Sequence, residues 1–277
     1  MEILQKLEKL IITIGNNDKI KVDKNNIEEV QSGVNFFSER MLARAEERMK
    51  IIIPKEDYKF DVIRSLTLDW SSTTNEPDEE YLWGGFQLLS LIESLGTHSH
   101  FWDNYNNDSR FWKNNLQPEA EAVWKEFLPK LNYFHKSAHG NDGTYGCILR
   151  EEGVYPCLIY FFDSGIWFKM DMNLGEYYDT MISSKAVYYW QYFYIDTQEI
   201  VKKLGNFKPR YVEHDVYYYQ GPNSFNNKFE DGTFMYSAEG VLHQMKNIVK
   251  RFPKLFPDVD LTYFREKCDA LEKALNK

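Results

Sequence analysis

Residues 60–70, Phe60-Asp61-Val62-Ile63-Arg64-Ser65-Leu66-Thr67-Leu68-Asp69-Trp70, carry the pattern that decides the fold. Apolar side chains at alternate positions fall on one side of an extended chain, which is the period of a β-strand with one buried face. Upstream, from Ile27 to Met49, apolar residues instead recur at spacings of three and four, the period of an amphipathic helix. Pro54 ends that pattern, because the residue before a proline is pushed out of the helical region. The change of period near Tyr58 therefore predicts a helical N-terminus followed by a sheet.

The segments that follow predict a mainly antiparallel sheet. Residues 81–89 form the next expected strand, in which Gly84 and Gly85 mark a bulge or a close backbone approach. Residues 144–151, 155–162 and 166–170 are rich in residues that favour strands and are joined by short turns, which connect antiparallel neighbours. Residues 187–194 fit a helix or a strand, residues 211–219 fit a strand, and helices are expected at 3–14, 101–136 (mainly), 174–181, 197–204, 238–251 and 261–275.

These elements indicate a single α+β domain over residues 1–277, with one mainly antiparallel sheet, flanking helices, and helical N- and C-terminal extensions. The length is enough to bury a large core without disulfides or a structural metal. Three cysteines are few and odd in number, as expected in a reducing compartment. The sequence shows neither a secretory signal nor an apolar run of about 20 residues. We therefore expect a cytoplasmic protein without a membrane span.

The negative charge is concentrated in two separate blocks. The chain has a net charge of −9; residues 51–100 hold three basic against nine acidic residues, and residues 151–200 hold two against eight. If the two blocks pack together, they form one acidic unit, which repels nucleic acid and attracts basic partners. Alternatively, the acidic side chains are spread over solvated faces and serve solubility. Nucleic-acid binding is also disfavoured by the densest aromatic stretch, residues 188–194, which contains no Lys or Arg.

No arrangement of residues gives a strong indication of catalysis. The sequence lacks a Gly-x-Ser-x-Gly turn and a glycine-rich phosphate loop. Cys147, Cys157 and Cys268 lie in apolar segments, where a thiol behaves as a small hydrophobe. The competing hypothesis is a metal-dependent hydrolase, whose zinc would be held by two histidine pairs and an aspartate if folding brought them together: His98, His100, Asp103, His135 and His139.

Five segments, taken in order, resemble the SUKH superfamily, which includes the Smi/Knr cell-wall regulators and many bacterial toxin-immunity proteins. They are similar to its proline-led entry after the first helix, its first strand, its glycine-pair strand, its central strand with an acidic end, and the helix after its last strand: Ile53–Tyr58, Leu66–Trp70, Gly84–Leu91, Tyr155–Asp163 and Leu174–Tyr178. The resemblance covers residues 27–195. It leaves residues 97–142 as a helical insertion and residues 196–277 as a C-terminal extension.

The resemblance implies a protein-binding module with no shared catalytic residues and no cofactor. We expect an immunity protein that neutralises a toxin by binding, with a basic toxin domain such as a nuclease as its partner and with no nucleic acid or membrane involved. A constitutive scaffold or regulator of cell-wall-related proteins is the alternative. Aromatic side chains dominate binding energies and acidic ones suit a basic partner. The expected contacts are such residues at loops and strand ends, although the tryptophans also suit a core: Asp69, Trp70, Glu79, Glu80, Tyr81, Trp83, Asp163 and Trp167.

Overall fold

The computed structural model describes residues 3–32, 38–61, 63, 65–73, 81–96, 128–138, 144–163, 166–204 and 237–276. The strands are β1 (Ile20–Asn25), β2 (Leu66–Ser72), β3 (Trp83–Leu88), β4 (Leu131–Lys136), β5 (Thr144–Leu149), β6 (Leu158–Asp163) and β7 (Ile166–Met170). The α-helices are α1 (Ile3–Gly15), α2 (Ile27–Ser32), α3 (Ser38–Met49), α4 (Leu91–Ser94), α8 (Leu174–Ser183), α9 (Thr197–Leu204), α11 (Ala238–Leu255) and α12 (Thr262–Leu275). Short 3-10 helices are η1 (Lys55–Phe60), η2 (Leu128–Lys130) and η3 (Trp190–Tyr194).

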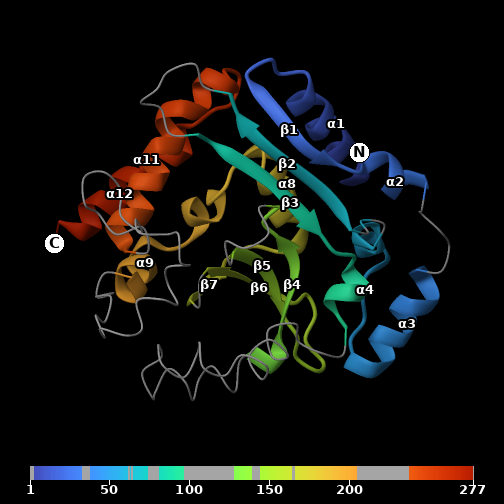
Figure 1. Ribbon diagram of the computed structural model, residues 1–277. Coiled ribbons are helices and arrows are strands. Elements are labelled where there is room, and N and C mark those ends of the chain that lie inside the picture. Colours follow the sequence, from blue (N-terminus) through green and yellow to red (C-terminus); the bar gives the residue numbers. More distant parts are fainter. Residues whose placement is uncertain are drawn as a thin grey trace, which may run out of the picture.

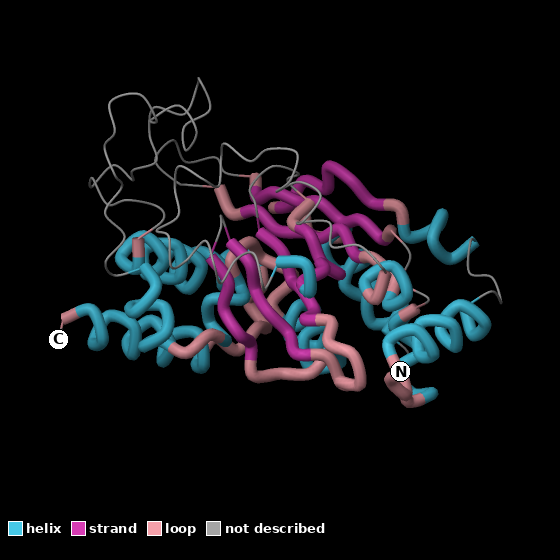
Figure 2. The backbone as a smooth tube through the Cα atoms, turned by 90° about the horizontal axis from the view of Figure 1, so that it is seen from below, coloured by secondary structure: helices cyan, strands magenta, loops and turns pink. Residues whose placement is uncertain are grey.

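The strands form one seven-stranded sheet in which each strand pairs with its neighbours in the sequence, in the order β1 to β7. Every one of these pairings is antiparallel. Figures 1 and 2 show the C-terminal helices α11 and α12 to one side of the strands and the N-terminal helices to the other. The structure therefore confirms the predicted α+β class with a single antiparallel sheet and flanking helices.

The pairing between β3 and β4 is the shortest in the sheet. Only the last two residues of β3 pair with β4. The first half of β3 is bordered instead by the loop after α8, where the amide of Tyr188 donates to the carbonyl oxygen of Trp83 and the amide of Gly85 donates to that of Ala186, both at 2.8 Å. The strands before and after this junction run in different directions (Figure 1). A loop thus completes the hydrogen bonding that β4 does not supply.

One face of the sheet carries the main core. Phe86 of β3 and Phe134 of β4 are almost fully buried on this face. Helix α8 packs against it, with the ring of Tyr177 4.8 Å from that of Phe134 and the ring of Tyr178 stacked 5.3 Å from that of Phe60. Because aromatic side chains bury large apolar areas, this contact anchors α8 firmly to the strands.

The C-terminal helices belong to the same core. Phe256, which follows α11, lies edge-on to Trp70 at 5.9 Å, and Phe264 of α12 stacks on Phe193 of η3 at 3.9 Å. Buried apolar side chains from α1 to α12 form one continuous cluster. The described part of the C-terminal extension therefore packs as part of the sheet domain.

The structure corrects the sequence-based interpretation at two strands. β1 lies in the N-terminal region that the sequence assigns to helices; Ile20 is its buried residue, and the rest of the strand is half-buried or exposed. Such a polar strand suits the edge of a sheet, where one side faces solvent. β4 lies in the segment expected to be mainly helical, and its Leu131, Phe134 and His135 have a spacing that also fits a helix. Pairing with β5 overrides that local pattern.

Two further boundaries differ from the expected ones. The strand expected from Phe60 begins only at Leu66, since residues 55–60 form η1. Asp61, which follows η1, is buried and accepts a hydrogen bond from the amide of Ile92 at 3.0 Å. Residues 190–194, which fitted a helix or a strand, form the 3-10 helix η3.

Some predictions lie outside the described residues. They are the strand at 211–219, most of the helical insertion at 97–142, and six candidate site residues: Glu79, Glu80, His98, His100, Asp103 and His139. Among the helices within the described ranges, none combines the length and apolarity needed to cross a membrane.

Candidate functional site

Two of the three tryptophans expected to contact a partner, Trp70 and Trp83, lie on opposite faces of the sheet. Trp70 of β2 is fully buried, whereas the side chain of Trp83 at the start of β3 is 45% exposed. Successive side chains on a strand point to opposite faces, so Trp83 lies on the face opposite to Phe86 and Leu88, which are in the core. Trp70 is therefore a core residue and not a contact residue, and Trp83 remains a candidate.

The burial of Trp70 depends on the glycine pair of β3. A Cβ atom on Gly84 would lie 2.5 Å from Trp70 Nε1, so the glycine makes room for the indole ring. The Nε1–H donates to the carbonyl oxygen of Lys185 at 3.1 Å. Gly85 has a φ of +138°, and a Cβ atom there would lie 2.9 Å from the Cα atom of Asp69. Both glycines therefore have a structural role, because a side chain at either position collides with β2.

An aromatic surface lies where the chain enters β3. Leu82 is buried, and its amide donates to Ser72 Oγ at 2.9 Å. The residues on either side of it, Tyr81 and Trp83, are 51% and 45% exposed. Asp69, half-buried on the neighbouring strand, lies opposite Gly85 and so shares the outer face with Trp83. We refer to Asp69, Tyr81 and Trp83 as the Trp83 patch.

The charges beside the Trp83 patch are mixed. On β1, Lys21 pairs with Asp23, and Lys24 lies opposite Asp69 in the strand register. The hydrogen bond and charge of Asp23, together with the charge of Asp69, raise the pKa of Lys21. Sequence reasoning missed these neighbours because it placed this region in helices; the alternation of apolar and charged residues from Ile20 to Asp23 is the signal that indicates a strand.

The remaining predicted contacts are not part of this patch. Asp163 at the end of β6 is buried, and the hydroxyl of Tyr192 donates to its Oδ2 at 2.6 Å. Trp167 is half-buried on β7, and Lys203 donates to its backbone oxygen. Three strands separate β3 from β7 in the sheet. The structure thus places Asp163 in the core and Trp167 in a separate region, because a buried carboxylate held by a tyrosine is not available to a partner.

His135 has a structural role that conflicts with metal binding. Its side chain is 3% exposed, and its Nδ1 atom lies 2.6 Å from the hydroxyl oxygen of Tyr177. Burial lowers its pKa to about 3. His135 is enclosed in the core, so it is not available as the zinc ligand that the hydrolase hypothesis requires. In the part of the chain that the structure describes, no three His, Cys, Asp or Glu residues cluster to hold a metal ion.

The three thiols are buried, and their pKa values are raised. Burial raises the pKa of Cys147 well above its usual value and the pKa values of Cys157 and Cys268 to about 11. A thiol nucleophile reacts as the thiolate, which these sites disfavour. The structure agrees with the interpretation of these cysteines as core residues.

Comparison of the chain with protein-family models, with curated proteins and with solved structures finds no match in any of the three.

Proposed function

We propose that this protein is a non-catalytic protein-binding module that neutralises a basic toxin domain by stoichiometric binding, in the manner of a SUKH-type immunity protein. The observation that carries the proposal is the Trp83 patch. Two large aromatic side chains, Tyr81 and Trp83, stand about half exposed on either side of a buried leucine. Tyrosine and tryptophan are the residues most enriched among those that dominate protein–protein binding energies.

The backbone that carries the patch is anchored by hydrogen bonds, which favours binding. Trp83 is paired through β2 at Ser71, and its carbonyl oxygen accepts the Tyr188 amide. Leu82, between the two aromatic residues, is held by two hydrogen bonds to Ser72. Its amide donates to Ser72 Oγ, and its carbonyl oxygen accepts from the Ser72 amide. A side chain held in place before binding loses less conformational entropy on association.

Charge and aromatic contacts have separate roles in this proposal. The chain as a whole is acidic, with a net charge of −9, so its long-range field attracts a basic domain. The charges next to the patch are of both signs. Electrostatic attraction therefore governs mainly the association rate, and burial of Tyr81 and Trp83 provides the affinity.

The test is co-expression with a toxin encoded beside this protein's gene. The double variant Tyr81→Ala/Trp83→Ala is expected to lose protection and to weaken binding of the purified toxin domain at least 30-fold. Tyr263→Ala is the matched control, because Tyr263 is 41% exposed on α12 and lies outside the patch. Full protection by the double variant, or a neighbouring gene that encodes no toxin, contradicts the proposal.

A further inference from the structure

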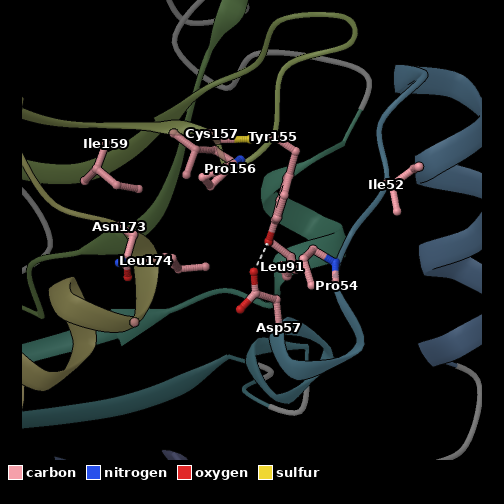
Figure 3. A pocket seen from close by; sticks show the side chains of 12 residues that line it. Ile52, Pro54, Asp57, Leu91, Tyr155, Pro156, Cys157, Ile159, Asn173 and Leu174 are labelled. Atoms are coloured by element: carbon pink, nitrogen blue, oxygen red, sulfur yellow. Dashed lines mark hydrogen bonds between the residues drawn. The ribbon is translucent and has the colours of Figure 1, made fainter.

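A pocket of about 310 Å³ is lined mainly by residues from the two acidic blocks of the sequence, 51–100 and 151–200. Its walls come from the segment before and within η1, from the loop and strand around Tyr155, and from the N-terminus of α8. Figure 3 shows Ile52 and Pro54 on one side of the pocket, Leu174 on the other, and Asp57 below Tyr155. Among the described residues that line it, Asp57 supplies the carboxylate.

Asp57 offers one free carboxylate oxygen to this pocket. The hydroxyl of Tyr155 donates to Asp57 Oδ2 at 2.7 Å. The other oxygen, Oδ1, has no hydrogen-bond partner among the described residues, and Figure 3 shows the carboxylate beside Leu174. Burial, followed by the hydrogen bond to Asp57, raises the pKa of Tyr155, so the phenol remains a donor. The pocket therefore contains a carboxylate with one acceptor position open.

The surroundings of the pocket favour a cation. Glu56 adds negative charge near Tyr155. At the first turn of α8, Glu176 Oε2 accepts the amide of Asn173 at 2.7 Å, which places a carboxylate at the helix end that borders the pocket. Arg150, whose charge acts on Cys157, donates to the backbone oxygens of Gly96 and Pro129. Within the part of the chain that the structure describes, no Lys or Arg lines the pocket itself.

The apolar rim indicates that a macromolecule covers the pocket. Ile52 lines it and is 84% exposed, the most exposed large apolar side chain among the described residues. Val154, next to Tyr155, is 37% exposed. A small amine inside the pocket would leave these side chains in water, whereas a protein partner would bury them.

We propose that the pocket receives a lysine side chain from a protein partner. The ammonium group binds Asp57 Oδ1, and the four methylene groups pack against Ile52, Pro54 and Leu174. Lysine suits the site because an ammonium is a point donor that one carboxylate oxygen can satisfy, whereas the planar fork of arginine is met best by two oxygens without other donors, and Tyr155 already donates to Oδ2. The volume is at the lower end for ligand pockets, which suits one side chain. This inference adds a second contact to the proposed function and rests on it for the identity of the partner as a basic protein.

The test is an NMR titration of the full-length protein with Nα-acetyl-lysine N-methylamide. Saturable shifts are expected at the amides of Asp57, Cys157 and Gly175, with a Kd in the millimolar range, and no saturation is expected with the norleucine analogue, which lacks the charge. Asp57→Asn keeps an acceptor for Tyr155 and should weaken binding at least fivefold. Glu56→Gln, which changes an acidic residue outside the lining, should weaken it less than twofold.

A second variant tests the geometry. Tyr155→Phe frees Asp57 Oδ2 and should allow the arginine analogue to bind at least as tightly as the lysine one. Equal response to lysine and norleucine analogues, tighter binding of arginine by the unaltered protein, or no effect of Asp57→Asn overturns the inference. The probe requires no toxin, so failure here is separate from failure at the Trp83 patch, which the co-expression test decides.

Discussion

The Nδ1 atom of His135 lies 2.6 Å from the hydroxyl oxygen of Tyr177, and both side chains are buried between the sheet and α8. The same hydroxyl accepts a hydrogen bond from Gln191 Nε2 at 3.3 Å. A hydroxyl that accepts from Gln191 and donates its one proton to Nδ1 satisfies both contacts; this arrangement corresponds to a neutral imidazole with its proton on Nε2. Nε2 is buried and has no hydrogen-bond partner within the described part of the chain. The Tyr177 hydroxyl links β4, α8 and η3.

The buried His135 predicts that stability falls in mild acid. Burial lowers its pKa in the folded protein to about 3, while an unfolded chain has a histidine pKa of about 6.5. Protonation therefore favours unfolding, and the stability is present above pH 6.5 and lost as the pH falls toward 3. Each pH unit in that window should lower the free energy of unfolding by ~1.4 kcal/mol from this residue. Urea denaturation between pH 7 and pH 4.5 measures the slope.

Two variants identify the source of that slope. His135→Asn should lower stability at pH 7 and should reduce the dependence on pH, because asparagine does not titrate. Phe264→Leu in the buried face of α12 is the control, because it lowers stability without removing an ionisable group and should leave the slope as it is. If His135→Asn retains the full slope, another group is responsible.

Gly146→Ala should be strongly destabilising because of Tyr177. A Cβ atom at Gly146 would lie 2.7 Å from Tyr177 Cζ, and closer still to its hydroxyl, in a close-packed core. We expect a loss of about 2–3 kcal/mol. Tyr177→Phe alone should lose about 1–3 kcal/mol, since His135 and Gln191 lose their partner. Because removing the hydroxyl relieves part of the clash, the double variant should lose less than the sum of the two. Strict additivity in chemical denaturation would count against this geometry.

Gly84→Ala should be destabilising because of Trp70. The added methyl group would meet the indole ring, so we expect a loss of about 2 kcal/mol or more. In a Trp70→Phe background the smaller ring vacates that space, and the further loss on adding Gly84→Ala should fall below about 1 kcal/mol. Gly15→Ala is the control, since no atom lies within 4 Å of its Cβ position. Thermal unfolding of the four variants provides the comparison.

The two tryptophans of β2 and β3 should respond to truncation very differently. Trp70→Ala removes a fully buried ring and its hydrogen bond to Lys185, and should lower the free energy of unfolding by about 3–5 kcal/mol. Trp83→Ala removes a ring that is 45% exposed and should change it by about 0.5 kcal/mol. Equilibrium unfolding tests both. A large loss for Trp83→Ala would show that this residue serves the fold rather than a partner.

Local periodicity accounts for the parts of the fold that the sequence predicted correctly. α1, α9 and α12 agree with the helices expected at 3–14, 197–204 and 261–275 to within about one residue. β2, β3, β5, β6 and β7 lie within or beside the expected strands. In each of these segments the spacing of apolar residues and the flanking turn residues agree with the final structure. The outward position of Trp83 also follows from its parity relative to Phe86 and Leu88.

Only the tertiary structure decided β1 and β4, the core position of Asp163, and the meeting of Asp57 with Tyr155. β1 buries Ile20 alone among its residues, and β4 has apolar spacing that also fits a helix, so pairing with β2 and β5 determined both. Asp163 is buried because Tyr192, distant in sequence, donates to it. Asp57 and Tyr155 are 98 positions apart. The physical reason is the same in each case. A hydrogen bond or strand pairing between segments that are distant in the sequence depends on how the chain brings those segments together, and the local spacing of side chains contains no information about that.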